Sequence, residues 1–435
     1  MKWNYLATLA LHLGALSFWG GNVARAAEPP VGSPFQTWCE QQNEISAEAR
    51  KTVEAVLEFA NTKDCQAAAE ALSYQTMLPL LERGISDLKP IAGLTHLTSL
   101  NLSGNSISDL SPLAGLTRLT RLSLSLNSIQ DVSPLANLMN LELLELGENQ
   151  ITDISALAGL TKLTHLSVFD NQITQVSLGN LNRLTMLSLS SNQISDIQSL
   201  GNLTNLTDLH LSRNQISDIR PLARLTNLTQ LNLHSNQISD IQPLSDLTNL
   251  TQLELHNNQI SEISSLSGLT LLNHLDLSDN QITDIRPLSG LQSLNRLLLD
   301  KNKITDVQPL SGLINLTGLV LDYNQIQEIE PLGRLTQLKG LHLINNQLSD
   351  ISTLGELVNL KFLFLNHNQI TDVTPLGRLT QLMILGLEDN QIADITPLSE
   401  LPSLETLWLK GNVMTEQTCP IIRSEACQFV GMPTE

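Results

Sequence analysis

The chain has 435 residues and a formal net charge of −19, with 15% charged and only 3% aromatic residues. Ordinary globular domains carry about 25% charged residues and more aromatic rings, so aliphatic side chains must fill the core. An acidic chain also lacks the basic surface that nucleic acid or an anionic membrane would need, and we expect neither as a partner. Because 41% of the residues are apolar and regularly spaced, the composition excludes a disordered chain.

Residues 1–26 have the pattern of a secretory signal peptide. Lys2 gives a positive start, an apolar run of 13 residues follows from Leu6 to Phe18, and Ala24–Ala26 supplies a small-x-small cleavage pattern. The apolar run is too short to span a bilayer, which argues against the alternative of an uncleaved anchor. We therefore expect a periplasmic or extracellular protein that begins at Ala27 and has no stable membrane insertion after cleavage.

Residues 27–76 are predicted to form a helical cap. From Ser46 to Asn61, apolar residues recur at the i, i+3, i+4, i+7 spacing that gives a helix one apolar face, and Ser46 can cap this helix. Asp64 can cap a second helix over residues 67–72. We expect these helices to cover the open end of the repeats that follow.

One period organises residues 77–418. Asparagines recur at steps of 22 residues, except for a step of 21 between Asn171 and Asn192. The unit from Leu228 to Leu247 is representative: it reads LxxLxLxxN and then IxDIxPLxxL, which is the signature of a leucine-rich repeat. A degenerate first unit has Arg83 at the asparagine position, which gives about 16 units. The asparagines are Asn105, Asn127, Asn149, Asn171, Asn192, Asn214, Asn236, Asn258, Asn280, Asn302, Asn324, Asn346, Asn368, Asn390 and Asn412.

The repeat predicts an α/β solenoid, a right-handed horseshoe with a parallel sheet on its concave side. In each Leu-x-Leu segment both leucines lie on one face, which a single unit cannot bury and stacked neighbours can. Twenty-two residues leave little room for the return of the chain. The frequent proline in the return has no N–H to offer a long helix, so we expect short 3₁₀ turns on the convex side.

The repeated polar residues are interpreted as structural. The asparagine lies where the chain turns away from the strand, and its amide can both donate and accept, so stacked asparagines should form a ladder. The acidic residue four positions later, such as Asp218 or Asp240, is expected to accept hydrogen bonds in a turn on the outer wall. The 21-residue step is either a local bend or a deletion tolerated on an outer loop.

Four cysteines lie at the two ends of the array: Cys39, Cys65, Cys419 and Cys427. An exported protein can keep disulfides, and we expect the local pairs Cys39–Cys65 and Cys419–Cys427; free thiols are the alternative. A solenoid holds its ends apart, which argues against one zinc site built from all four. Residues 419–435 would then form a small C-terminal cap.

Histidines form the first group of candidate binding residues. The variable positions of each strand face the concave solvent, and His234 and His256 occupy the same position in adjacent repeats, with backbones about 4.8 Å apart. With His274 they are candidates to hold Zn²⁺ or Cu²⁺. The alternative, a solvated polar face that tolerates histidine, is favoured, so we expect no metal and no cofactor.

The second group is apolar and lies in the later repeats, where exposed apolar patches usually mark interaction sites. Glycines 318, 340 and 386 are expected to leave hollows in the same surface. The alternative is that Trp408 and its neighbours pack beneath the C-terminal cap. The candidate ligand-binding residues are Phe362, Phe364, Ile384, Trp408, Ile344, Tyr323 and His342.

Motifs of the common enzyme classes are missing from the sequence: GxSxG, HExxH, the P-loop and a GxGxxG in a βαβ context do not occur. We therefore expect a monomeric binding scaffold and no enzyme, with no catalytic residue. The favoured ligand is a protein or peptide held by the concave sheet. A glycan or cell-envelope binding module of the same architecture is the alternative.

The units resemble the 22-residue repeats of bacterial internalin-type proteins and of the regulatory subunit of protein phosphatase 1. The predicted export signal and helical cap favour the exported bacterial branch. This resemblance implies that the concave sheet binds another protein. Internalins often add an Ig-like domain and a wall-sorting tail, for which this sequence has no counterpart, so wall attachment is not expected. Their ligand-contact residues do not carry over, because those positions vary among internalins.

Overall fold

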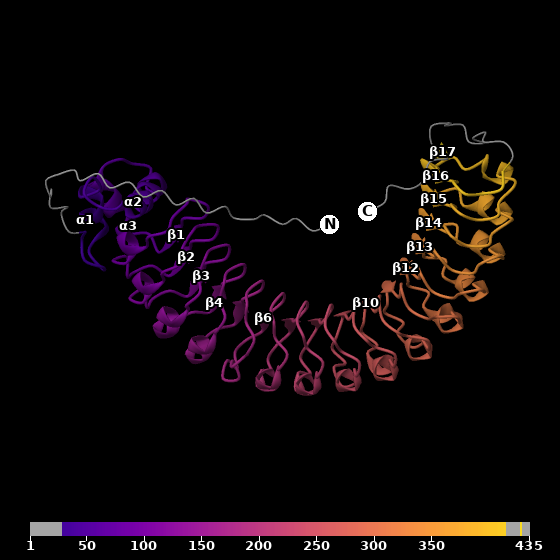
Figure 1. Cartoon of the computed structure of the whole chain (residues 1–435), viewed down its shortest axis with the longest axis horizontal. Coiled ribbons are helices and arrows are strands. Elements are labelled where there is room, and N and C mark those ends of the chain that lie inside the picture. Colours follow the sequence, from indigo (N-terminus) through magenta and orange to yellow (C-terminus); the bar gives the residue numbers. More distant parts are fainter. Residues whose placement is uncertain (1–27, 415–426, 429–435) are drawn as a thin grey trace, which may run out of the picture.

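The computed structural model describes residues 28–414 and 427–428. The chain coils into an open arc in which the strands line the inside and short helical turns lie outside (Figure 1). Every strand pairs in parallel with the next one along the chain, in one continuous sheet. The architecture is the predicted leucine-rich repeat solenoid.

The strands are β1 (Met77–Pro79), β2 (Ser99–Asn101), β3 (Arg121–Ser123), β4 (Leu143–Glu145), β5 (His165–Ser167), β6 (Met186–Ser188), β7 (Asp208–His210), β8 (Gln230–Asn232), β9 (Gln252–Glu254), β10 (His274–Asp276), β11 (Arg296–Leu298), β12 (Gly318–Val320), β13 (Gly340–His342), β14 (Phe362–Phe364), β15 (Ile384–Gly386), β16 (Thr406–Trp408) and β17 (Cys427–Gln428).

The returning segments on the convex side are 3₁₀ helices, as the proline positions predict. They are Lys89–Ile91, Ser111–Leu113, Ser133–Asn137, Ser155–Gly159, Gln198–Asn202, Arg220–Arg224, Gln242–Leu244, Ser264–Gly268, Arg286–Leu288, Gln308–Gly312, Glu330–Arg334, Ser352–Glu356, Thr374–Arg378 and Thr396–Leu398.

Three helices precede the array: α1 (Phe35–Glu40), α2 (Ala47–Phe59) and α3 (Cys65–Ser73). The two predicted helices are confirmed with their caps, because the Ser46 hydroxyl accepts from the N–H of Ala49 and the Asp64 carboxylate accepts from the N–H of Ala67. The sequence prediction missed α1, whose Phe35 and Trp38 are buried.

The disulfide Cys39–Cys65 joins α1 to α3, with the two Cα atoms 5.6 Å apart. This predicted pair is confirmed. A disulfide of this kind removes conformations from the unfolded chain and so holds a small cap together. The second predicted pair depends on Cys419, which lies outside the described residues, as does most of the proposed C-terminal cap.

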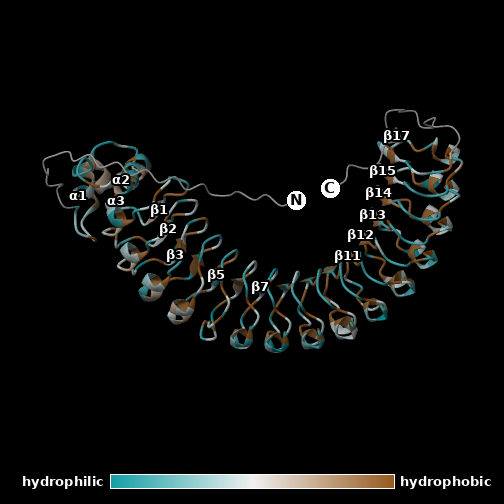
Figure 2. Cartoon of the chain, in the orientation of Figure 1, coloured by the Kyte–Doolittle hydropathy of each residue, from teal (hydrophilic) through white to brown (hydrophobic). Residues whose placement is uncertain are grey.

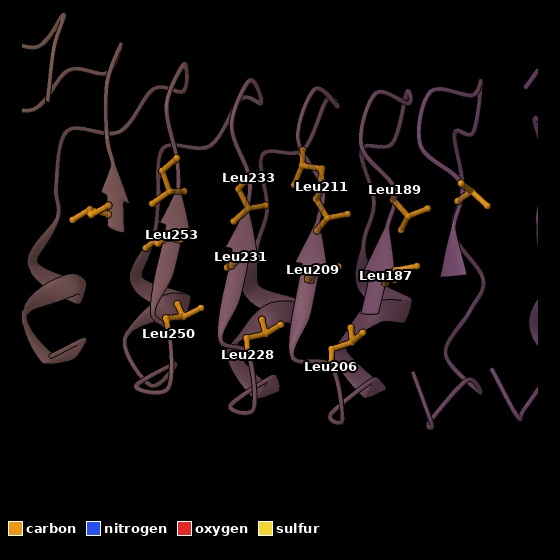
Figure 3. Close-up of a cluster of buried hydrophobic side chains, with 14 of the residues drawn as sticks. Leu187, Leu189, Leu206, Leu209, Leu211, Leu228, Leu231, Leu233, Leu250 and Leu253 are labelled. Carbon is orange, nitrogen blue, oxygen red and sulfur yellow. The ribbon is translucent and has the colours of Figure 1, made fainter. Parts of the chain in front are cut away.

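The core is a stack of leucine layers that runs the length of the arc. The leucines of each coil lie against the same leucines of the next, and side chains such as Leu209 and Leu253 are fully buried (Figure 3). Each buried leucine contributes roughly 1.5–3 kcal/mol relative to an exposed one. Apolar and polar residues alternate within every coil instead of gathering at one end (Figure 2). Each unit therefore depends on its neighbours for burial.

The asparagine column satisfies the polar backbone between the layers. Asn214 shows the pattern: its Nδ2 donates to the carbonyl oxygens of Leu189 and Leu211 at 3.0 and 3.1 Å. Its Oδ1 accepts from the N–H of Ile194 in the preceding repeat at 3.0 Å. The asparagines from 105 to 412 make the same contacts. Each amide thus ties its own turn to the repeat before it.

The residue before each asparagine has a left-handed backbone, with φ between 50° and 59° at the non-glycine positions of the repeats. Few side chains adopt this conformation without cost. Leu126 and Tyr323 occupy it nonetheless, while Gly104 and Gly411 occupy it at the two ends. The asparagine hydrogen bonds fix the turn in this shape in every repeat.

The acidic column lies on the outer wall as predicted. The Asp240 carboxylate accepts from the N–H of Gln242 at 2.8 Å, and Asp218 and Asp284 accept in the same way from the residue two positions on. These carboxylates cap the start of the 3₁₀ helices.

The shortened repeat keeps its place in the sheet. Between β5 and β6 the described chain has no 3₁₀ helix, yet His165 pairs with Met186 in unbroken register. An extra bridge between Gln175 and Asp196 replaces the missing turn on the convex side. The deletion therefore falls on the outer wall, the second of the two sequence interpretations.

Replacing Asn214 by alanine is expected to lower the free energy of unfolding by about 1–3 kcal/mol, because one buried N–H and two buried carbonyl groups lose their partner. The measurement is urea unfolding followed by circular dichroism. The neighbouring exposed Gln215 provides the control, and its replacement by alanine should change stability by less than about 0.5 kcal/mol. Equal effects of the two variants would contradict the structural role of the asparagine column.

Candidate binding surface

Three columns of side chains make up the concave face. In β8, Leu231 points into the core, while Gln230 and Asn232 on either side of it are half-buried on the concave surface, and His234 follows two residues later. We call the positions of Gln230, Asn232 and His234 the first, second and third concave columns. Each column continues across the sheet, because neighbouring strands pair without a shift.

The predicted apolar residues lie in these columns on neighbouring strands. Phe362 and Ile384 pair with each other in the first column. Ile344 belongs to the third column, and Tyr323 lies one residue beyond it at a left-handed turn. Phe362 and Tyr323 are 38% and 50% exposed, which is unusual for rings in a chain with so few of them. The predicted residues thus belong to neighbouring repeats, those of β12–β16.

The second column carries a line of rings that we call the aromatic row: His342, Phe364 and Trp408. The ring centroids of His342 and Phe364 are 4.4 Å apart, and those of Phe364 and Trp408 are 6.0 Å apart with nearly parallel planes. Offset pairs at such distances stabilise each other by about 0.5–1.5 kcal/mol. The core beneath is complete without them, since Leu363 and Leu385 are fully buried.

The glycines of this region differ from the sequence prediction in one respect. Gly340 has nothing within 4 Å of the place where a Cβ would stand, so it leaves an open hollow, and Gly318 is nearly as open. Gly386 does not. A Cβ there would stand 2.2 Å from Oδ1 of Asn366 and 3.3 Å from the Phe364 ring. The predicted hollow at Gly386 is wrong, because these two side chains already cover it.

Stacked imidazoles occupy the third column in the middle of the arc. The rings of His234 and His256 are 4.1 Å apart and nearly parallel. Nδ1 of His256 lies 3.0 Å from Oδ2 of Asp276, a charge contact without the direction of a full hydrogen bond. His274 lies in the first column, away from the stacked pair. Among the residues that the structure describes, no three His, Cys, Asp or Glu side chains are placed to hold a metal ion.

The two imidazoles titrate in opposite directions. Burial, together with the neighbouring His256, lowers the pKa of His234 to about 4. The contact with Asp276 raises the pKa of His256, against the effect of burial. Burial works to raise the pKa of Asp276, but the contact with His256 and the Ser278 N–H, which donates to Oδ1 at 2.9 Å, outweigh it and the net pKa is lowered. Near neutral pH the His234 ring is therefore neutral, and it stacks on the His256 ring, whose affinity for a proton is increased.

Several polar residues on this face were not singled out from the sequence. Asn366 is 1% exposed, and its Nδ2 donates to Oε2 of Glu388 at 3.1 Å. Its Oδ1 is buried without a hydrogen-bond partner among the described residues. Asp300 and Asp322 are half-buried in the third column. In the sequence, Asn366, Asp300 and Asp322 look like any other residue at a variable position. Only their burial distinguishes them, and the sequence does not show it.

The model for paired leucine-rich repeats matches eight segments of the chain between residues 95 and 399. The chain belongs to the leucine-rich repeat family. It shares 34% identity with the internalin InlF of Listeria monocytogenes, over 84% of this chain and 96% of that one, with a TM-score of 0.58. The protein is internalin-like, as its repeats predict.

Two further solved structures extend the comparison. A leucine-rich repeat protein of Leptospira interrogans is 27% identical over 82% of this chain and 94% of its own, with a TM-score of 0.74. The Arabidopsis receptor kinase HAESA ectodomain, solved with a peptide hormone ligand, is 26% identical over 77% and 66% of the two chains, with a TM-score of 0.62. No curated protein matches the chain in sequence.

The lowered pKa of His234 predicts a loss of stability in acid. An unfolded histidine has a pKa of about 6.5, so between pH 6.5 and 4 the unfolded chain binds more protons at this position than the folded chain. Stability should therefore fall as the pH falls through this window. Urea unfolding at several pH values should show a smaller acid loss for His234→Gln than for the wild type.

The raised pKa of His256 has the opposite effect on stability in acid, and the His234→Gln variant keeps that residue. His210→Gln, on the concave face of β7, makes the same substitution outside the stacked pair and is the control for the exchange of histidine by glutamine. A His234→Gln profile that coincides with the wild type would contradict the assignment of the acid loss to this ring.

Proposed function

We propose that the protein is an exported scaffold that binds a protein or peptide ligand through its concave face. The contact patch comprises Phe362, Phe364, Ile384, Trp408, Ile344, Tyr323 and His342. The observation that carries the proposal is the aromatic row, which lies on the solvent side of a sheet whose core is already filled by leucines. Rings that the core does not need, gathered on one surface, are typical of a binding site.

The comparisons support the ligand class. Leucine-rich repeat solenoids serve as protein-binding scaffolds, and the HAESA ectodomain holds a peptide hormone. By extension, the contact patch would bind the apolar part of a polypeptide ligand. No catalytic role is proposed, because the patch consists mainly of apolar side chains and its one imidazole, that of His342, packs on Phe364.

Export is supported by the disulfide of the N-terminal cap and by the apolar segment that begins at Leu6. No helix among the described residues is long and apolar enough to cross a membrane. Mass spectrometry of the protein from periplasm or culture medium should find a mature chain that starts at Ala27. A chain that retains its first 26 residues in the cytosol would overturn the export proposal.

The ligand-contact proposal is tested by Phe364→Ala. The mature chain is immobilised and used to capture partners from envelope extract, and the affinity for the captured partner is then measured for each variant. Loss of a buried aromatic anchor should cost about 2 kcal/mol or more, roughly a 30-fold rise in Kd. Met186→Ala is the matched control, because Met186 is an exposed apolar residue of the same concave face on β6.

Three outcomes would contradict the proposal. A melting temperature lowered by many degrees in Phe364→Ala would make the ring structural. Binding that survives both Phe364→Ala and Trp408→Ala would place the contact surface elsewhere. Both variants are needed because the residues of the proposed C-terminal cap, which would lie over Trp408, are outside the described residues. Binding to a glycan array, lost in the same variants, would favour the alternative of a glycan-binding module.

A further inference from the structure

Three carboxylates follow one another across the strands next to the aromatic row. Asp276 ends β10, and Asp300 and Asp322 stand in the third column of the next two repeats. All three side chains are at least partly buried, and those of Asp276 and Asp322 are only 13% and 14% exposed. Adjacent strands lie about 4.8 Å apart, so the three charges are near neighbours. Like charges at that spacing repel each other unless a cation is present.

Asp300, in the middle, is the carboxylate without a cation. Asp276 has His256 at 3.0 Å and Asp322 has His342 at 3.5 Å. Among the described residues, no basic nitrogen lies within ion-pair distance of Asp300, although Arg296 and Lys301 belong to the same repeat. Burial raises the pKa of Asp300, and the charges of Asp276 and Asp322 raise it further.

An unpartnered hydroxyl lies in the same cluster. Ser278, in the third column between His256 and Asp300, is 8% exposed. Its Oγ is near enough to lower the pKa of both Asp276 and Asp300, yet it lacks the geometry of a full hydrogen bond to any described residue. A buried hydroxyl without a hydrogen-bond partner, next to a half-buried carboxylate without a cation, points to a charged donor that the chain does not supply.

The hydrogen-bond donor that would complete this cluster is a long basic side chain and not a metal ion. The carboxylates form a line over successive strands and do not converge on one point, which is why no three ligands within the described chain suit a metal ion. A guanidinium or ammonium group on a long side chain can instead lie along such a line and donate to more than one carboxylate. Basic side chains of a polypeptide have this chemistry.

The carboxylates and the aromatic row form one continuous surface. His342 joins them, because its Nδ1 lies 3.5 Å from Asp322 while its ring packs on Phe364. From Asp300 to Phe364 the surface crosses three strand spacings and shifts by two residues along the strand, a distance of roughly 16 Å. An extended peptide rises about 3.3 Å per residue, so four to five residues cover it.

We propose that the ligand is an extended peptide segment that runs across the strands, with an arginine or lysine over Asp276, Asp300 and Asp322. An aromatic or large aliphatic residue four to five positions away packs on the aromatic row. This rests on the proposed function and adds to it the charge, spacing and direction of the bound segment. The acidic repeats then contribute attraction and register, while the rings contribute apolar burial.

The test uses a phage-displayed library of random twelve-residue peptides, selected on the mature chain. Enriched peptides should carry a basic residue four to five positions from an aromatic or large aliphatic one. For a synthetic peptide of this kind, Asp300→Asn should raise Kd about tenfold or more, whereas Glu328→Gln should leave it within about twofold. Glu328 is an exposed carboxylate of the outer wall, and its replacement by glutamine removes the same charge as Asp300→Asn.

Asp300→Asn should keep or raise the melting temperature, because it removes repulsion within the carboxylate line. A second measurement needs no variant of the protein. Salt at 0.5 M should weaken the binding of the basic peptide much more than the binding of a peptide with glutamine in place of the basic residue. Peptides enriched in apolar residues without a basic one, or affinity that Asp300→Asn leaves unchanged, would overturn the inference and leave the proposed function intact. Peptides whose binding ignores Phe364→Ala would overturn both.

Discussion

Every repeat from Asn105 onward buries a turn whose backbone would otherwise be unsatisfied, and one asparagine amide supplies the missing partners. The amide of Asn214 joins two carbonyl groups and one N–H across adjacent coils. Because a buried unpaired polar group costs about 1–3 kcal/mol, a coil without its asparagine would weaken its own fold and its contact with the coil before it. The left-handed residue that precedes each asparagine belongs to the same constraint. The leucine layers can stack only when this turn is fixed.

This constraint divides the chain into residues that hold the array together and residues that are free of that task. Leucines and asparagines recur because the coils need them, and the acidic column recurs because carboxylates such as that of Asp240 accept from the N–H of the first residue of a 3₁₀ helix. The concave columns carry no such demand. Their side chains vary from serine and histidine in the middle repeats to phenylalanine and tryptophan in the later ones. A surface that is free to vary and yet gathers rings beside a line of carboxylates, one of which has no cation, is where a ligand would be recognised.

The sequence predicted what periodicity determines. The register of the sheet, the 3₁₀ turns, helices α2 and α3 and the pair Cys39–Cys65 follow from spacing and capping residues. Helix α1 was missed because six residues are too few to show a period, and Pro34 before it offers no capping side chain. The stacking of His342 on Phe364 and the covered Gly386 were also beyond prediction. Contacts between columns depend on side-chain directions and on burial, for which a variable position carries no signal.

The concave side chains of β14 and β15 are dispensable for folding, and one comparison of the stabilities of two variants tests this directly. The triple variant Phe362→Thr, Phe364→Thr, Ile384→Thr replaces three concave residues by a residue that suits strands. Leu363→Thr changes only the fully buried leucine between the two rings. In urea unfolding we expect a smaller loss of stability for the triple variant than for Leu363→Thr, which should cost about 2–5 kcal/mol. A loss in the triple variant equal to or greater than that of Leu363→Thr would contradict this expectation.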